Sequence, residues 1–280
     1  MTLPRPLIDR AIEAAFAEDL GLSGDITTDA CIPADATSKT VIAARKPGTI
    51  AGLDLARAAF EYLSTETNTN FQIEDGARVT KGGVIARIEG PSRAILTAER
   101  IALNYLGRLS GIATMTAALV DAVSHTEAQI ACTRKTTPGL RAFEKHAVKC
   151  GGGKNHRFGL FDAVMIKDNH IIAAGGINAA LAAVRTHVGH TVKIEIEIDR
   201  LDQLEAALTG GADIILLDNM STDELREAVR LTKGRARLEA SGNVTLETVA
   251  GIAETGVDTI SSGALTHSAP NLDLGLDFLT

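Results

Sequence analysis

The basic side chains of this sequence are concentrated in one segment. Residues 133–172 hold eight Lys and Arg against three Asp and Glu, a local net charge of +5 within a chain of net charge −7. Three of the seven histidines, His146, His156 and His170, lie in the same segment. Because a cationic pocket in an acidic protein concentrates small anions, the segment predicts a site for an anionic small molecule.

Four of these cations follow features that predict contact with a ligand. Arg134 and Lys135 end the apolar run QIACT, and Lys167 ends DAVMI, so each closes a predicted buried strand. Arg157, with His156 beside it, follows three consecutive glycines, which let the backbone approach a ligand closely. An unpaired charge at the end of a buried strand is costly, so we expect these side chains to meet an anion.

Other positively charged residues favour simpler interpretations. Lys145 and Lys149 stand four residues apart on a helical stretch, which is typical of a solvated face. The string GGGKN lacks the spacing of a nucleotide-binding P-loop, so it does not predict nucleoside triphosphate binding.

Carboxylates follow two further predicted strands. Glu195 and Glu197 alternate along one strand and therefore face the same side, while Asp218 ends the next strand. Carboxylate oxygens are the ligands that Mg²⁺ prefers, so Glu197 and Asp218 predict a magnesium site, with direct or water-mediated contact left open.

Small polar residues end the last two predicted strands. Backbone N–H groups at this position commonly bind phosphate in α/β barrels. The residues are Ser241, Gly242 and Asn243, and then Ser262, Gly263 and Ala264. From its residues alone, the chain is expected to bind a multiply anionic small molecule, a phosphate monoester and a divalent metal.

Composition excludes several classes of protein. Aromatic residues are 3% of the chain and Trp is absent, which together with the negative charge argues against a nucleic-acid partner. No apolar run is long enough for a membrane span or a signal peptide, so we expect a cytoplasmic protein with no membrane partner. Cys31, Cys132 and Cys150 form neither a CxxC pair nor a zinc spacing, so we expect no disulfide scaffold and no structural metal.

The predicted elements change character along the chain. Before residue 94 helices alternate with β-rich stretches, and 94–123 reads as one long, mostly buried helix. Residues 71–90 resemble half of a biotinyl-type barrel, but Lys81 lacks the setting of a modified lysine, so we interpret them as a packing region rather than a carrier. Beyond 128, six short strands alternate with helices, which predicts a parallel sheet. Nearly every predicted strand is followed by a polar residue or glycine. The carboxyl ends of barrel strands converge on one mouth, whereas an open, doubly wound sheet would spread these residues along a line, so we favour a TIM-like barrel.

The central block TRKTTPGLRAFEKHAVKCGGGKNHRFGLFDAVMIKDNHI resembles the quinolinate phosphoribosyltransferase family. Shorter motifs extend this resemblance over almost the whole chain: GDITT (24–28), KPGTIAG (46–52), TAERIALNYLGRLSGIAT (97–114), EIEID (195–199), ILLDNM (215–220), LEASGN (238–243) and GALTHS (263–268). The resemblance implies an N-terminal open-faced α/β sandwich, residues 1–112, followed by an incomplete TIM-like α/β barrel, residues 113–280, with a C-terminal tail that packs back on the first domain. It also implies a homodimer, or a hexamer built from dimers, with shared active sites.

The same resemblance assigns roles to individual residues. It places Arg134, His156, Arg157 and Lys167 on the two carboxylates of quinolinate, and Arg100 in the site of the neighbouring subunit. The alternative for Arg100 is an ion pair within its own chain, with Glu99 or another nearby acid. It places Lys135, Lys167, Glu197 and Asp218 around phosphoribosyl diphosphate and Mg²⁺, and the two small-residue loops on the 5′-phosphate. His267 lies in a family motif without an assigned role, and Ala240 stands where relatives often have Ser.

The implied reaction converts quinolinate and phosphoribosyl diphosphate to nicotinate mononucleotide, pyrophosphate and CO₂, a step of NAD synthesis. A related transferase with another acceptor would keep the residues around the donor but alter the carboxylate clamp. That clamp is complete in this sequence.

Overall fold

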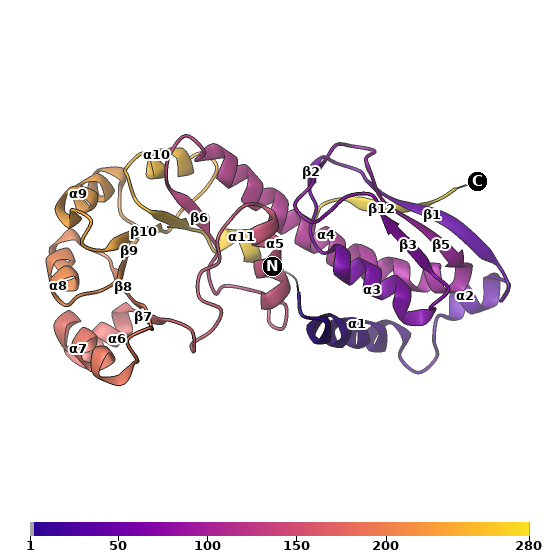
Figure 1. Ribbon diagram of the computed structural model, residues 1–280, viewed down its shortest axis with the longest axis horizontal. Helices are drawn as coiled ribbons and strands as arrows, with labels where there is room; N and C mark the ends of the chain where they lie inside the picture. Colours follow the sequence, from indigo (N-terminus) through magenta and orange to yellow (C-terminus); the bar gives the residue numbers. More distant parts are fainter. Residues whose placement is uncertain (1–2, 280) are drawn as a thin grey trace. The chain divides into compact units, whose positions relative to one another are not determined.

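The computed structural model describes residues 3–279, which form two compact units (Figure 1). The first unit contains the chain up to Met115, together with Ala142–Gly152 and the residues from Ser268 onward. The second contains Thr116–Arg141 and Gly153–His267. Two segments that follow residue 112 therefore belong with the N-terminal part of the chain. Within the described range, no helix combines the length and apolar character needed to cross a membrane.

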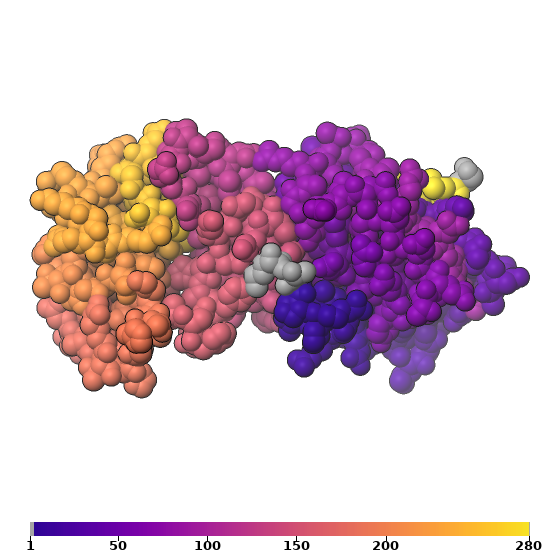
Figure 2. Space-filling view, viewed as in Figure 1, coloured from indigo at the N-terminus to yellow at the C-terminus, as the bar shows by residue number. Residues whose placement is uncertain are grey.

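The first unit is built on a four-stranded antiparallel sheet. Its central strand β1, Thr37–Ala44, pairs with β5, Val84–Pro91, on one side and with β12, Leu274–Phe278, on the other. The C-terminal strand thus completes the N-terminal sheet, and its yellow atoms lie against violet ones in Figure 2. The remaining strands of the unit are β2 (Gly48–Thr49), β3 (Asn68–Phe71) and β4 (Arg78–Val79).

Residues 71–90 form part of this sheet system, as the packing interpretation predicts. Strand β4 pairs with β2, whereas β5 pairs with β1 and β3, so β4 and β5 do not pair with each other. Lys81 lies in the turn between them. It therefore does not occupy the hairpin tip that presents the modified lysine of a carrier domain.

Small residues on the long helix α4, Ser92–Ala122, accommodate the C-terminal tail. The backbone N–H of Leu272 donates to the carbonyl of Gly107 at 2.9 Å, and a Cβ added at Gly111 would overlap the carbonyl of Pro270. The GRLSG spacing therefore lets the tail cross the helix closely on its way to β12. The other helices of this unit are α1 (Arg5–Leu20), α2 (Ile26–Cys31), α3 (Leu53–Leu63) and α5 (Arg141–Cys150).

Helix α5 departs from the expectation of a solvated face. Lys149 is exposed as predicted, but Lys145 is fully buried, together with its neighbours from Phe143 to Val148. The buried Glu144 forms an ion pair with Arg108 of α4 at 2.8 Å. The i,i+4 pattern of lysines was misleading because the first unit covers this helix on several sides.

The second unit is a six-stranded parallel sheet in the order β6-β11-β10-β9-β8-β7. Each strand lies beside its neighbour in sequence, except that the last, β11, returns to the first, β6, as in a barrel. No ladder joins β6 to β7 within the described residues, so the barrel is incomplete, as predicted. The strands are β6 (Gln129–Ala131), β7 (Val164–Ile166), β8 (Ile194–Ile198), β9 (Ile214–Asp218), β10 (Arg237–Ser241) and β11 (Thr259–Ser261).

Alternation along the strands separates the core from the site. On β8, Ile194, Ile196 and Ile198 are buried on one face, while Glu195 and Glu197 point to the other. The helices lie outside the curved sheet (Figure 1). They are α6 (Asp168–Ala174), α7 (Ile177–His187), the short 3₁₀ turn η1 (Leu201–Gln203), α8 (Leu204–Thr209), α9 (Thr222–Thr232), α10 (Val249–Ala253) and α11 (Ala264–His267).

Candidate active site

A cavity of about 280 Å³ opens at the carboxyl ends of the barrel strands. Because parallel strands all end at the same edge, residues far apart in sequence meet here. Most of the residues predicted for the site line this cavity: Arg134, Lys135, His156, Arg157, Lys167, Glu197, Asp218 and Ser241. Four cations and two carboxylates of the predicted set therefore share one small space with a further carboxylate, that of Glu239.

Arg134 and Lys135 reach the cavity for a different reason than the sequence suggested. Strand β6 ends at Ala131, and both cations lie exposed on the loop that follows it. The prediction that they are charges at the end of a buried strand is therefore wrong. Their position at the cavity, rather than a desolvation penalty, is what makes them available to an anion.

Arg157 lies in a part of the cavity that is unfavourable for its positive charge. Burial lowers the pKa of its guanidinium, and the neighbouring positive charge of Arg134 lowers it further. Its Nη1 donates to the carbonyl of Ala163 at 3.2 Å, but its buried Nε has no hydrogen-bond partner within residues 3–279. Two guanidinium groups that repel each other, one with an unsatisfied buried donor, form a site that an anion would stabilise.

The two predicted metal ligands stand on adjacent strands of the same cavity. Glu197 accepts a hydrogen bond from Lys167 through Oε2, and Asp218 accepts one from Asn219 through Oδ2 at 2.8 Å. In the described part of the chain, the second oxygen of each carboxylate makes no hydrogen bond. A hard cation with waters in its coordination sphere suits these two free oxygens, so the residues present fit a magnesium ion.

His156 is held by two buried glutamates. The backbone N–H of Arg157 donates to His156 Nδ1 at 2.8 Å, and Nε2 lies 2.9 Å from Oε2 of Glu195. An oxygen of Glu239 lies 3.6 Å from the same Nε2. Burial and the charge of Glu195 raise the pKa of Glu239 to about 7. The imidazole is therefore fixed in orientation at the cavity wall.

The sequence analysis missed Glu239 as part of the site. It precedes Ser241 by two residues on β10, so it faces the same side as that predicted phosphate residue. Ser261 lines the cavity as well, opposite Ser241 in the strand register. The period-two alternation of strands was a signal that could have identified both residues.

An adjoining cavity of about 390 Å³ collects the predicted phosphate loops. Gly242 adopts a φ of +94°, and a Cβ there would overlap the side chain of Asn219. Asn219, which was not selected from the sequence, accepts a hydrogen bond from the side chain of Asn243 at 3.3 Å and so links the loop after β9 to the loop after β10. Residues shared with the first cavity include Lys135 and Asp218. Predicted residues in its lining are Ser241, Gly242, Asn243, Ser262, Gly263 and Ala264, and His267, which had no assigned role, lines it as well.

Arg100 is the one predicted site residue that does not line these cavities. It is exposed on α4, in the part of that helix that belongs to the first unit. Among residues 3–279, no ion pair joins Arg100 to Glu99, the alternative partner considered from the sequence. Its assignment to a neighbouring subunit remains a prediction.

Comparison with known proteins identifies the same family in both halves of the chain. Residues 25–110 match the N-terminal domain of quinolinate phosphoribosyl transferase, and residues 112–277 match its C-terminal domain. A nicotinate-nucleotide pyrophosphorylase [carboxylating] of Mycobacterium leprae is 45% identical over 95% of both chains, and a probable one of Bacillus subtilis is 44% identical over 94% of this chain and 90% of its own. The crystal structure of NadC from Streptococcus pyogenes superimposes with a TM-score of 0.95 at 42% identity and covers all of both chains.

Proposed function

Since this chain belongs to the quinolinate phosphoribosyltransferase family, we propose that the barrel cavity carries out that reaction. The phosphoribosyl group of phosphoribosyl diphosphate is transferred to quinolinate, and nicotinate mononucleotide, pyrophosphate and CO₂ are released. The observation that carries the proposal is the pair formed by Arg134 and Arg157, whose mutual repulsion and unsatisfied buried donor suit a dicarboxylate. Lys135 and Lys167 extend the positive charge along the same cavity.

The residues position and neutralise their ligands rather than form a covalent intermediate. The ring nitrogen of quinolinate forms a bond to the anomeric carbon, and the carbon–oxygen bond to pyrophosphate breaks, so the electron pair departs with pyrophosphate. We assign Lys135 and Lys167 to the charge of that leaving group. Glu197 and Asp218 face the cavity, where negative charge stabilises the cation-like ribosyl group. The loops around Gly242 and Gly263 offer backbone N–H groups to the 5′-phosphate.

Decarboxylation follows from the new bond to nitrogen. A quaternary ring nitrogen withdraws electrons, so the bond between the ring and the adjacent carboxylate can break, its electron pair stays on the ring, and that carbon then takes a proton. Arg134 and Arg157 keep the ring oriented through its carboxylates, and His156 supports the same wall. When bound by Glu197 and Asp218, Mg²⁺ would supply charge stabilisation to the diphosphate.

The assembly is part of the proposal. We assign Arg100 to the active site of a second copy of the chain, in a homodimer or in a hexamer built from dimers. Its exposed guanidinium is a planar, bidentate donor for a carboxylate. A cytoplasmic location remains the expectation from the sequence.

The acceptor decides between this function and a related transferase. Purified protein is incubated with phosphoribosyl diphosphate and Mg²⁺, with either quinolinate or nicotinate as acceptor, and release of pyrophosphate and CO₂ is measured. Turnover of quinolinate with little turnover of nicotinate is expected, because a single carboxylate leaves part of the cationic clamp unpaired. Equal turnover of nicotinate, or of neither acid, would contradict the proposed acceptor.

A further inference from the structure

A second cluster of potential ligand atoms lies in the first unit, on helix α5 and the loop before β4. His146 Nε2 is 2.7 Å from Oδ2 of Asp75 and 3.4 Å from Sγ of Cys150. His146 and Cys150 lie one turn apart on the helix, whereas Asp75 comes from 71 residues away. Carboxylate, imidazole and thiol atoms within 4.8 Å of one another combine three of the ligand types that bind zinc.

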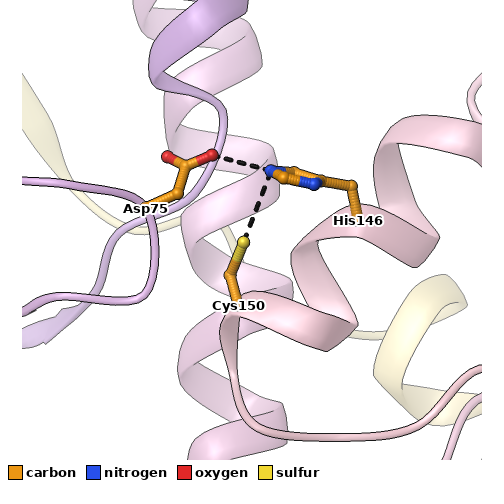
Figure 3. Close-up of side chains that lie close together, drawn as sticks. All are labelled: Asp75, His146 and Cys150. Carbon is orange, nitrogen blue, oxygen red and sulfur yellow. Dashed lines mark hydrogen bonds and ion pairs between the residues drawn. The ribbon is translucent and has the colours of Figure 1, made fainter. Parts of the chain in front are cut away.

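Both contacts end on the same nitrogen of the ring, as Figure 3 shows. In a nucleophilic cysteine triad, the thiol and the carboxylate bond to opposite nitrogens, so that one orients the ring while the other transfers the proton. Here one N–H faces two acceptors and can donate well to only one of them. The geometry is therefore unlike a catalytic triad and resembles a set of ligands that converge on one point.

The distances are close to those of a coordinated cation. In a tetrahedral site with Zn–N and Zn–O bonds of about 2.0 Å and a Zn–S bond of about 2.3 Å, ligand atoms lie roughly 3.3 to 3.6 Å apart. The His146–Cys150 contact of 3.4 Å already falls in this range, and the Asp75–His146 contact of 2.7 Å needs to lengthen by roughly 0.6 Å. In the described structure, Nδ1 of His146 has no hydrogen-bond partner. A metal on Nε2 would not change the surroundings of Nδ1, so this missing hydrogen bond does not distinguish the metal-bound from the metal-free state.

The surroundings hold the ligands in place. The backbone N–H of Leu53, at the start of α3, donates to Oδ1 of Asp75 at 3.1 Å, which leaves Oδ2 directed at His146. Gly76 brings the loop against α5: a Cβ at this residue would lie 3.3 Å from the carbonyl oxygen of Cys150, and its φ of +91° favours glycine. Partners that orient a ligating carboxylate are typical of metal sites.

A cavity of about 550 Å³ gives solvent access to the three ligands. Its cations do not occupy the cluster: the Arg57 guanidinium lies over the ring of Phe71, 4.7 Å from its centre, and Lys149 is exposed. Asp54 and Glu74 also line the cavity and add negative charge. A water molecule from this cavity can complete a four-coordinate site.

We propose that Asp75, His146 and Cys150 bind a divalent transition metal ion of the Zn²⁺ type, with water as the fourth ligand. Binding releases the proton of the thiol and any proton on Nε2, and it links helix α5 to the loop that precedes β4. The sequence analysis expected no structural metal because it considered cysteine pairs alone. The ligands are instead a His-x₃-Cys pair on one helix face and an aspartate from a distant loop.

Cobalt provides a direct test, because Co²⁺ bound to a thiolate in a tetrahedral site has characteristic charge-transfer absorption. The purified full-length chain, freed of metal with a chelator, is titrated with Co²⁺ and then with Zn²⁺ in excess Mg²⁺, which occupies the oxygen ligands of the barrel. We expect the thiolate band to saturate at one Co²⁺ per chain and to disappear when Zn²⁺ is added. Absence of the band in the native chain would overturn the proposal.

Three variants locate the site. Cys150→Ser should abolish the band and weaken Zn²⁺ binding by at least about 100-fold. Mutating a residue that only hydrogen-bonds a metal ligand typically lowers metal affinity by about 10- to 100-fold, and removing a ligand itself should lower it at least as much. Asp75→Asn, which can still accept from Leu53, should weaken Zn²⁺ binding while the thiolate band remains at high Co²⁺. The exposed Cys31 is the matched control, and Cys31→Ser should bind as the native chain does. A band that persists in Cys150→Ser, or unchanged affinity in Asp75→Asn, would contradict the assignment.

Discussion

The chain contains two histidines that each face a pair of acidic or thiol groups, yet the two rings are held in different ways. In the barrel, His156 accepts a backbone N–H on Nδ1 and lies between Glu195 and Glu239, so contacts on both ring nitrogens fix its orientation. In the first unit, burial lowers the pKa of His146, but hydrogen bonds with Asp75 and Cys150 outweigh this and raise the pKa to about 10. The metal-free His146 is therefore a cation at neutral pH.

The contacts of the second ring nitrogen distinguish the two histidines. A backbone donor on Nδ1 helps to make His156 a rigid wall of the cavity, and burial together with the charge of Glu195 raises the pKa of the neighbouring carboxyl group of Glu239. Without such a donor, His146 gains a proton where it meets Asp75. The barrel cluster suits the positioning of a substrate, whereas the cluster on α5 suits exchange of its proton for a metal ion.

The largest expected difference between the two regions is catalytic. Arg157→Ala should lower kcat/KM for quinolinate on the order of 100-fold or more, because the lost guanidinium is a half-buried charge that we assign to the substrate carboxylates. Lys149→Ala, which removes an exposed cation from the cavity beside His146, should leave kcat/KM nearly unchanged. Steady-state kinetics of both variants test the contrast, and similar losses would mean that both regions serve the reaction.

The metal requirement should also belong to the barrel. Glu197→Ala and Asp218→Ala should each raise the Mg²⁺ concentration needed for half-maximal activity by at least about tenfold, since each removes a carboxylate ligand. Cys150→Ser is the matched control from the other cluster and should show the native Mg²⁺ dependence. Normal Mg²⁺ activation in both carboxylate variants would refute the assignment of the metal to this cavity.

Subunit mixing tests whether the first unit takes part in catalysis through Arg100. Arg100→Ala and Arg134→Ala chains should each be nearly inactive alone. If Arg100 acts across a dimer, random exchange should restore about a quarter of the native activity, because half of the dimers carry one intact site. Activity after exchange, verified with tagged chains, is the measurement. No recovery after complete exchange would place the role of Arg100 within its own chain.

A smaller effect should appear in the stability of the barrel cluster. The folded pKa of Glu239, about 7, exceeds its ordinary value of 4.5, so its favourable contribution is complete below pH 4.5 and is lost as the pH rises through 7. Glu239→Gln cannot ionise and should not show this loss, so its unfolding temperature should exceed that of the native chain by a few degrees at pH 8. Thermal unfolding of both proteins at pH 5 and pH 8 checks this. The same change in unfolding temperature between the two pH values in both proteins would refute it.

The stabilising contribution of the cluster on α5 should be lost at higher pH than that of the barrel cluster. In metal-free protein the contribution of His146 is complete below its ordinary pKa of 6.5 and is lost as the pH rises through about 10. Asp75→Asn removes the partner carboxylate, so it should destabilise the chain modestly at pH 7 and less at pH 10. Thermal unfolding with a chelator present measures the difference. A gap between the two chains that widens with pH would contradict the charged state of His146.

Much of the barrel could be predicted from local sequence. Short apolar strands at regular spacing, each followed by a polar residue, placed Lys167, Glu197, Asp218 and Ser241 at one edge, because parallel strands end together. Alternation on β8 separated the isoleucine core from the glutamates. These features depend on neighbours within a few residues, so the sequence alone determined them.

Contacts between distant segments were decided only by the tertiary structure. Nothing near Arg134 shows that β6 stops at Ala131, and nothing in the lysine spacing of α5 shows that Lys145 is buried. The meeting of Asp75 with Cys150 depends on the loop at Gly76 reaching a helix that follows it by many residues. The sequence determined which side chains were available, but packing determined which two groups each histidine faces, and those contacts hold each ring in place.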